Sequence, residues 1–391
     1  MAEVFAGADN IITSLGFTTS ENIKNIKKGL TGLDISTDEA LSPVPLPLSL
    51  IDQHRLVSSF EQYIGTHYTG LKNEDFTRLE KMFILSIHDA LSKTRINIQD
   101  KRTLLILSTT KGNIDLLTPP LEKRFERKRI YMWELARVLK DHFGSPNTPM
   151  VVSNACISGV LGIIFGKRMI KAGLYDNVIV TGGDIITDFV ISGFQSFQTL
   201  SPEPCKPFDK SRNGLSLGEG CGTIIFSSDP AIIGSNEEIR VLSGACSNDA
   251  NHISGPSRTG EGLYIAIRNI LKSSMLKPED IDYISAHGTA TDYNDEMESK
   301  ALSWAKLNTV PVNSYKGCFG HTLGAAGVIE SIISLYSMKQ NVLLRSTGFE
   351  ELGVSRKINV IDEFKEKQIN TCLKTASGFG GCNAAVIFSK Y

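Results

Sequence analysis

One cysteine, Cys156, stands where a thiol could act as a nucleophile. It follows the apolar, β-branched pair Val151–Val152 and precedes a helical pattern over Ile157–Ala172, which Gly173 should end. This spacing predicts a strand-to-helix turn, with the thiol on or just before the helix N-terminus. The unpaired N–H groups and the positive dipole end of a helix favour a thiolate there. We therefore expect Cys156 to be a reactive cysteine, held by the elements on either side of it.

Two histidines lie in glycine-rich segments that would let a substrate approach them. His287 comes after a predicted strand and is followed by Gly288, and His321 follows Gly320 in a glycine-rich loop. Ligands bind at such strand ends in α/β folds. Lys316 lies five residues before the second histidine. Packing or surface positions are the ordinary interpretation for four other histidines: His54, His67, His88 and His142.

The elements that must position these side chains alternate between strand-like and helix-like segments. This alternation predicts an α/β architecture with largely parallel sheets. The polar stretch Ser228–Glu238 is the best candidate for an internal boundary, and the similar plan on both sides of it suggests duplication. Predicted strands are Arg102–Leu107, Asn177–Thr181, Thr223–Ser227, Ile239–Ser243, Ile281–Ala286 and Ala384–Phe388. Predicted helices are Gly262–Ser273, Asn294–Leu307 and Gly327–Gln340.

Several motifs occur along the chain in the order found in one known family. Together they resemble the β-ketoacyl-acyl-carrier-protein synthases of the thiolase-like superfamily, in the elongating group that uses a Cys-His-His set. A single such motif would be weak, but several in order with sensible spacing are highly specific, and the resemblance runs from about Asp9 to Phe388. The motifs are Asn154-Ala155-Cys156, Pro207-Phe208-Asp209, Arg212, Gly218-Glu219-Gly220, His287-Gly288-Thr289-Ala290-Thr291, Asn294-Asp295, Lys316 before His321, and Gly378-Phe379-Gly380-Gly381.

The resemblance implies a thiolase-like α/β fold of five layers, αβαβα, built from two duplicated halves. We expect residues 1–230 to form an N-terminal half that carries Cys156. Residues 231–391 should form a C-terminal half that carries both His287 and His321. The active site would then lie between the halves, where pockets commonly form.

The same resemblance implies a decarboxylative condensation. Cys156 would attack an acyl thioester held on an acyl carrier protein and become acylated. Malonyl-carrier would then lose CO₂, while N–H donors of His287 and His321 stabilise the enolate. The carbanion would attack the acyl-cysteine and give a β-ketoacyl chain two carbons longer. No metal or redox cofactor is called for, because the substrates arrive on the phosphopantetheine arm of the carrier.

Further residues take supporting roles from this resemblance. Lys316 would act electrostatically and order the second histidine loop, and Glu330 would pair with it, because an unpaired buried lysine is costly. The backbone N–H groups of Cys156 and Phe379 would form an oxyanion hole. Phe379 would also act as a gate between the two half-reactions, with Gly380 as part of its hinge.

Composition narrows the function classes. The chain has 391 residues, 41% of them hydrophobic and 21% charged, with a formal net charge of −1. Such a chain has no global field that would draw it to nucleic acid or membrane. No signal peptide is evident, and no run approaches the roughly 20 apolar residues of a membrane span. Seven scattered cysteines without a CxxC pair fit reduced thiols in the cytoplasm and argue against a structural zinc site.

A short basic run is the expected contact for an acidic partner. Acyl carrier proteins are acidic, and a local basic patch on a nearly neutral protein suits a transient acidic partner, although a solvated helix face is the ordinary meaning of such a run. The basic run consists of Lys123, Arg124, Arg127, Lys128 and Arg129. Ser254 could hydrogen-bond the pantetheine arm.

The resemblance also implies a homodimer, paired through a strand near Asn177–Thr181, and a heterodimer with a related subunit stays open.

The chain departs from the family pattern close to the expected substrate. Asn213 stands where Asp is usual, Cys382 replaces a Thr, and Ser108–Asn113 replaces a Gly-rich segment. These changes leave the acyl chain open between housekeeping fatty acid synthesis and a specialised product such as an aryl polyene. The alternative function is a non-catalytic partner resembling a chain-length factor, and the intact Cys156 argues against it. A degradative thiolase and a starter-unit synthase fit less well, because Lys316 and the paired histidines do not match their catalytic sets.

Overall fold

The computed structural model describes residues 3–119, 121–235 and 237–390. Its largest sheet has eleven strands in the order β13-β11-β10-β15-β16-β9-β1-β8-β6-β4-β5. Two small sheets, β2-β3-β7 and β12-β14, accompany it. The strands are β1 (Phe5–Ile12), β2 (Asp34–Ser36), β3 (Leu46–Ser49), β4 (Thr103–Ser108), β5 (Met150–Val152), β6 (Asn177–Asp184), β7 (Leu217–Gly218), β8 (Gly220–Ser227), β9 (Ile239–Asn248), β10 (Tyr283–Ser285), β11 (Pro311–Asn313), β12 (Val342–Leu343), β13 (Asn359–Val360), β14 (Lys365–Glu366), β15 (Thr371–Gly378) and β16 (Cys382–Ser389).

The strand order repeats on either side of the junction between β1 and β9. Outward from β1 come β8, β6, β4 and β5, and outward from β9 come β16, β15, β10 and β11. Both series run antiparallel, antiparallel, parallel, parallel. This repeat confirms the plan of two similar halves. The predicted boundary between residues 230 and 231 falls in the connection from β8 to β9 and stays a prediction.

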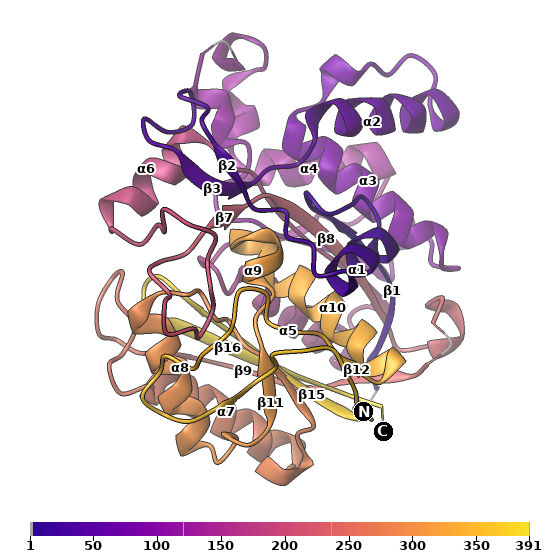
Figure 1. The fold of residues 1–391 in the computed structure, drawn as a ribbon. Coiled ribbons are helices and arrows are strands. Elements are labelled where there is room, and N and C mark those ends of the chain that lie inside the picture. Colours follow the sequence, from indigo (N-terminus) through magenta and orange to yellow (C-terminus); the bar gives the residue numbers. More distant parts are fainter. Residues whose placement is uncertain (1–2, 120, 236, 391) are drawn as a thin grey trace.

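Helices form three layers around the two halves of the sheet (Figure 1). The middle layer is α5 and α10, which contact each other and strands of both halves. One outer layer is α3 with α2 and α4, and the other is α7 with α8. The five predicted layers are therefore confirmed. The helices are α1 (Thr19–Lys27), α2 (Gln53–His67), α3 (Arg78–Ser92), α4 (Met132–Phe143), α5 (Ser158–Lys171), α6 (Asp188–Ser196), α7 (Glu261–Ser274), α8 (Asp292–Trp304), α9 (Lys316–Phe319) and α10 (Ala326–Gln340).

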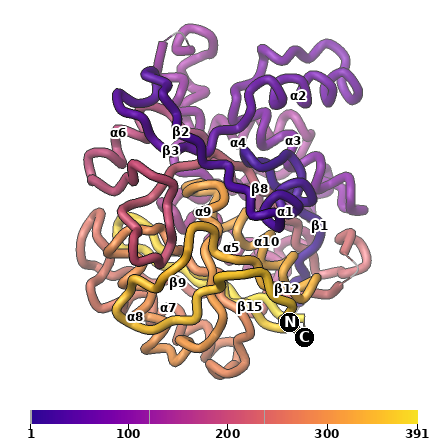
Figure 2. The backbone as a smooth tube through the Cα atoms, viewed as in Figure 1, coloured from indigo at the N-terminus to yellow at the C-terminus, as the bar shows by residue number. Residues whose placement is uncertain are grey.

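The apolar core follows these layers. One buried cluster joins Ile163 of α5 and Ile332 of α10 to strands of both halves. A second lies under α3 around Phe83, and a third lies under α7 around Ile267. Helix α10 is buried on almost every side, as its apolar sequence requires. The indigo-to-magenta and orange-to-yellow parts of the backbone therefore meet along a central apolar layer (Figure 2).

Two expectations about the sheet were wrong. The sheet is not largely parallel, because its middle strands, from β15 through β16, β9, β1 and β8 to β6, pair antiparallel. β15 and β16 form a hairpin, whereas β1 and β8 pair although they are far apart in sequence. The strand at Asn177–Thr181 cannot extend a sheet across a dimer axis, because β6 pairs with β4 along one edge and β8 along the other. The edge strand of that half is β5. Among the described residues, no helix is long and apolar enough to span a bilayer.

Glycines allow α5 and α10 to approach each other closely. A Cβ at Gly159 would lie 2.7 Å from the backbone N of Val328, and a Cβ at Gly327 would lie 2.4 Å from the backbone N of Val160. Because these neighbours are backbone atoms, they cannot rotate aside as a side chain could. This contact fixes the N-terminal ends of both helices relative to each other, and Cys156 precedes one of those ends.

Replacing Gly159 by Ala should lower the free energy of unfolding by about 1–3 kcal/mol, because the new methyl group would overlap the backbone of α10. Gly65→Ala is the matched control, since a Cβ there meets nothing within 4 Å. Because Gly65 lies on the exposed side of α2, this control should raise stability by about 0.5–1 kcal/mol. Urea unfolding of both variants measures the difference, and equal effects would contradict the close contact.

Candidate active site

Cys156 lies in the turn between β5 and α5, as the sequence predicted. Ala155 has a φ of 45°, a left-handed conformation that non-glycine residues seldom adopt. The Ser158 hydroxyl holds this turn, donating to the Ala155 carbonyl at 2.6 Å and accepting from the Asn154 N–H at 2.8 Å. Strained backbone that is over-determined in this way is frequent at functional sites. The cysteine itself is 7% exposed.

The structure brings both predicted histidines to this thiol. His287 follows β10, and His321 follows α9. Their rings lie edge to face with centroids 5.1 Å apart. Ring nitrogens of the two histidines and the sulfur of Cys156 all lie within 4.8 Å of one another. The first half of the chain therefore supplies the thiol, and the second half supplies both imidazoles.

Hydrogen bonds to the Nδ1 atoms set the tautomers of the two rings. Nδ1 of His321 accepts the backbone N–H of Leu323 at 3.2 Å, and Nδ1 of His287 faces the Lys316 ammonium at 3.3 Å. A neutral ring whose Nδ1 is an acceptor carries its proton on Nε2. Nε2 of His321 is buried and has no protein partner among the described residues. Both rings can thus direct an N–H donor into the space beside Cys156.

A buried ionic network lies behind the histidines. The Lys316 ammonium is 2.7 Å from Oε1 of Glu330 and donates to the His287 carbonyl at 2.5 Å, so the predicted pair of Lys316 and Glu330 is present. Oε2 of Glu330 is 2.6 Å from a second ammonium, that of Lys374. Both lysine side chains are fully buried, and Glu330 is nearly so. One carboxylate therefore bridges two buried cations.

The surroundings keep both imidazoles neutral. Burial lowers the pKa of His287 and of His321 well below the usual value for histidine, and the nearby Lys316 ammonium lowers both further. Glu298 fixes the backbone at the first histidine, because its carboxylate accepts the N–H groups of His287 at 2.8 Å and Gly288 at 2.6 Å. The rings are thus uncharged hydrogen-bond donors on a rigid backbone.

The thiol is not the preformed thiolate that its helix end suggested. Burial raises the pKa of Cys156 to about 12, while the ammonium groups of Lys316 and Lys111 act in the opposite direction. Loss of solvation in this closed site outweighs the helix terminus. The resting group is a neutral thiol, and the N–H groups of the helix end can stabilise charge only as it develops.

Phe379 lies at the tip of the hairpin between β15 and β16. Its ring packs on Phe194 and Phe197, with centroids 5.4 Å and 5.0 Å apart. Gly380 and Gly381 have φ values of 84° and 71°, which glycine adopts without strain. A Cβ at the preceding residue, Gly378, would lie 3.0 Å from the backbone N of Cys156. The hairpin tip therefore lies against the cysteine, while the oxyanion and gating roles of Phe379 stay predictions.

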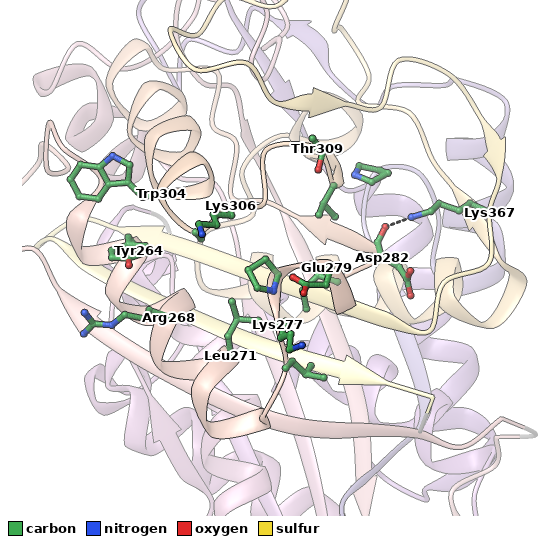
Figure 3. A pocket seen from close by; sticks show the side chains of 16 residues that line it. Tyr264, Arg268, Leu271, Lys277, Glu279, Asp282, Trp304, Lys306, Thr309 and Lys367 are labelled. Atoms are coloured by element: carbon green, nitrogen blue, oxygen red, sulfur yellow. Dashed lines mark hydrogen bonds between the residues drawn. The ribbon is translucent and has the colours of Figure 1, made fainter.

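Two cavities differ in what lines them. The site cavity has a volume of about 300 Å³ and includes Cys156, both catalytic candidates His287 and His321, the Phe379 hairpin and Ser254. A larger hollow of about 820 Å³ lies on the outer side of the second half, between Trp304 and Lys367 (Figure 3). No cysteine or histidine lines this larger hollow. Of these two cavities, the smaller one is the one that thiols and imidazoles line.

The predicted carrier contacts divide into two groups. Arg129 binds the buried carboxylate of Glu80 at 2.5 Å, so this residue stabilises the fold. Lys128 pairs with Glu126 at 2.7 Å. The run lies on short 3₁₀ turns instead of the helix face considered from sequence. The members that remain exposed, with no ion pair recorded among the described residues, are Lys123, Arg124 and Arg127.

Sequence reasoning missed three buried charged residues that shape the site. They are Lys374 on β15, Glu298 on α8 and Asp184 at the end of β6. Asp184 accepts the N–H of Gly324 at 2.7 Å and that of Thr110 at 3.0 Å, which links the two halves beside the His321 loop. A lysine inside a strand with no other charged residue was the one available signal for Lys374.

The donor set of the site could also hold a metal ion. Cys156, His287 and His321 are close enough together to act as ligands, and sulfur with two imidazoles is a combination that Zn²⁺ accepts. Their neighbours, however, include the ammonium groups of Lys316 and Lys374, which disfavour a dication. A reaction without a metal therefore stays our prediction.

Comparisons with known proteins agree with this geometry. Two family models match, one described as the N-terminal domain of β-ketoacyl synthase, over residues 135–230, and one as its C-terminal domain, over residues 239–350. Together they cover more than half of the chain. The first ends at residue 230, within the polar stretch between β8 and β9, and the second begins at residue 239, where β9 begins.

Individual proteins show the same likeness. The chain is 33% identical over 261 residues to 3-oxoacyl-[acyl-carrier-protein] synthase 2 of Rhizobium meliloti, which covers 63% of this chain and 61% of that protein. It is 30% identical over 275 residues to a putative mitochondrial 3-oxoacyl-[acyl-carrier-protein] synthase of Schizosaccharomyces pombe, covering 66% and 65%. The matched region thus spans less than two thirds of either relative. In fold, this chain resembles a chain from the complex of a ketosynthase with its chain length factor from Xenorhabdus doucetiae. The TM-score is 0.84 at 23% sequence identity, and the likeness covers 99% of this chain and 98% of the other.

The raised pKa of Cys156 predicts how its reactivity depends on pH. The rate of alkylation by iodoacetamide should rise continuously from about pH 7 to about pH 10, because the thiolate fraction grows about tenfold per pH unit below the pKa. Peptide mapping by mass spectrometry would follow Cys156 in a Cys246→Ser background, which removes the exposed cysteine. A rate that reaches a plateau below about pH 8 would show a low-pKa thiolate and contradict this account.

Proposed function

Because the chain belongs to the β-ketoacyl synthase family, we propose that it extends acyl chains by decarboxylative Claisen condensation. The observation that carries the proposal is that one thiol and two imidazoles, Cys156, His287 and His321, line one cavity. A thiol alone would fit many enzymes. The two neutral N–H donors beside it fit a reaction in which an enolate forms and then attacks a thioester.

The first half-reaction loads the acyl group. The sulfur of Cys156 attacks the acyl thioester of an acyl carrier protein, and the bond from the acyl carbon to the pantetheine sulfur breaks. The proton of the Cys156 thiol passes to the departing pantetheine sulfur, so neither histidine has to become charged. The negative charge of the tetrahedral intermediate faces the hairpin tip, where the N–H groups of Cys156 and Phe379 are the proposed donors.

The second half-reaction forms the carbon–carbon bond. Malonyl-carrier loses CO₂, and the electron pair left behind becomes an enolate whose oxygen accepts the Nε2–H groups of His287 and His321. The enolate carbon attacks the acyl carbon on Cys156, and the cysteine leaves as a thiolate that takes a proton from solvent. Neither half-reaction calls for a metal or redox cofactor, because bond making and breaking involve only thioesters and a carboxylate.

We propose that an acyl carrier protein delivers both substrates. Lys123, Arg124 and Arg127 would meet its acidic surface, since these cations are exposed and have no ion pair recorded among the described residues, and Ser254, which lines the site cavity, would contact the pantetheine arm. All seven cysteines are free thiols, which suits a reducing compartment such as the cytoplasm.

We also propose that the chain acts as a homodimer, with a heterodimer as the alternative. The edge strand β5, which leads to Cys156, offers unpaired backbone groups for such pairing. The similar complex from Xenorhabdus doucetiae joins a ketosynthase to a chain length factor. A non-catalytic, chain-length-factor-like role for this chain is less well supported, because Cys156 and both histidines are present and correctly grouped.

Acyl loading tests the role of Cys156. Incubation with acyl-carriers of graded length should add one acyl mass to the intact protein, and Cys156→Ala should abolish this addition. Cys382→Ala removes the other thiol of the cavity and should still be acylated. Intact-mass spectrometry measures both variants, and the chain length at which loading stops would separate a housekeeping from a specialised substrate. Equal acylation of Cys156→Ala and the wild type would refute the assignment.

Decarboxylation of malonyl-carrier tests the two histidines separately from acylation. His287→Ala and His321→Ala should each lower the rate of CO₂ release by about 10²–10³-fold, because each removes one donor to the enolate oxygen. Loading of Cys156 should survive in both variants, since neither ring is needed to remove the thiol proton. If loading fell as much as decarboxylation did, the division of labour proposed here would be wrong.

A further inference from the structure

A second buried lysine, Lys374, takes no part in the steps above. It lies in β15, opposite Ser285 of β10 on one side and Val386 of β16 on the other. Its side chain has no exposed surface. Burying an ammonium group costs several kcal/mol unless charge and hydrogen bonds compensate it. A lysine in this position therefore needs a specific reason in its surroundings.

Four oxygen atoms surround the ammonium group of Lys374. Its nitrogen donates to the carbonyls of Thr375 at 2.7 Å, Ala286 at 3.1 Å and Ser285 at 3.3 Å. Oε2 of Glu330 lies 2.6 Å away as an ion pair outside hydrogen-bond geometry. These atoms form a four-oxygen cage. The three N–H groups of the Lys374 ammonium donate to the three carbonyls, and the carboxylate of Glu330 provides the compensating negative charge. Such a cage resembles the coordination of a dehydrated monovalent cation.

The cage is attached to the active site on two sides. Ser285 and Ala286 immediately precede His287, so the ammonium fixes the backbone that carries this histidine. Glu330 shares its other oxygen with Lys316, which in turn contacts Nδ1 of His287 at 3.3 Å. A displacement of the Lys374 ammonium group would therefore shift the ring of His287 in two ways. It would move the backbone at Ser285 and Ala286, and it would disturb the ion pair of Glu330 with Lys316.

We propose that Lys374 is a positioning residue of the condensing site, a tethered cation that fixes His287 and completes the charge balance around it. The proposal rests on the proposed function, since the property that Lys374 secures is the neutral N–H donor for the enolate. Lys374 touches neither substrate nor thiol in this account. It acts through Glu330 and through the carbonyls before His287.

The charge balance explains why a single lysine would not suffice. Lys316 and Lys374 carry two positive charges, and Glu330 and Glu298 carry two negative ones, all four in buried positions. Other buried titratable groups beside His287 are Cys156, His321 and Asp295; Asp295 accepts the N–H groups of Thr289 and Ala290, and burial raises its pKa to about 6. Without Lys374, the set of two lysines and two glutamates would hold one excess negative charge. A proton taken up by His287 is a low-cost way to restore neutrality in a buried site. An imidazolium ion would then replace the neutral donor.

Removal of the side chain should leave the cage intact but empty. Lys374→Ala opens a channel of one side chain's length, which a small monovalent cation can enter. Lys374→Met also removes the charge but fills most of that channel. The two variants thus separate loss of charge from loss of space. Lys81→Ala is the matched control, because Lys81 is another lysine with little exposure, 6%, and lies away from the site cavity.

The experiment measures CO₂ release from malonyl-carrier by the full chain. Lys374→Ala should lose about 100-fold in rate, because Glu330 keeps only one of its two buried partners. Ammonium chloride should recover part of that rate, and tetramethylammonium chloride, whose cation is too large for the cage, should not. Lys374→Met should be slow in both salts, and Lys81→Ala should match the wild type in both.

A second readout does not depend on turnover. In protein with ¹⁵N-labelled histidine, the His287 signal of Lys374→Met should titrate at higher pH than in the wild type, because a positive charge has been removed from its surroundings. Ammonium should restore the wild-type titration in Lys374→Ala. If the wild type released no CO₂, the proposed function would fail, and this titration would still decide the role of Lys374. Wild-type turnover by Lys374→Ala, absence of a selective ammonium response, or an unchanged His287 titration would each overturn the proposal.

Discussion

The close contact of α5 and α10 is the constraint on which the rest of the site depends. Gly159 and Gly327 let the backbones of these two helices touch, and no side chain lies between them at this point. Cys156 precedes the first helix, and His321 precedes the second. A thiol and an imidazole that are 165 residues apart in sequence are thereby held in one small cavity. The outer layers of the fold stabilise this central pair, and α8 also contributes to the site, because Tyr293 and Asn294 line the cavity and Glu298 accepts the backbone N–H of His287.

Charge compensation is the second requirement, because the charged side chains behind the two imidazoles are buried. Two neutral imidazoles can act as donors only if the charges behind them cancel. The bridging of Lys316 and Lys374 by Glu330, together with the carboxylate of Glu298 below His287, achieves this in a buried space. Burial also raises the pKa of the Cys156 thiol. One physical cause, desolvation, therefore favours the uncharged form of Cys156, His287 and His321.

The sequence predicted which side chains the structure brings together better than it predicted their electrostatics. Cys156, His287 and His321 were found from their types and glycine-rich surroundings, and the pair of Lys316 and Glu330 from family resemblance. The state of the thiol was predicted wrongly, because burial depends on the packing of both halves and is invisible in a local motif. Lys374 was missed for the same reason: its partners Ser285, Ala286 and Glu330 are distant in sequence. Strand direction was also misjudged, since the alternation of strands and helices does not reveal that strands distant in sequence, such as β1 and β8, pair antiparallel.

The most direct test of the central claim is the fate of an acyl group already loaded on Cys156. The acylated protein would be mixed with malonyl-carrier labelled with ¹³C at the methylene carbon. Mass spectrometry would then measure the masses of the acyl groups bound to the carrier. The account predicts a β-ketoacyl-carrier two carbons longer than the loaded chain, with one labelled carbon and the release of one CO₂ per product, and with Cys156 returned to the free thiol. Formation of labelled acetyl-carrier alone, with Cys156 still acylated, would contradict it.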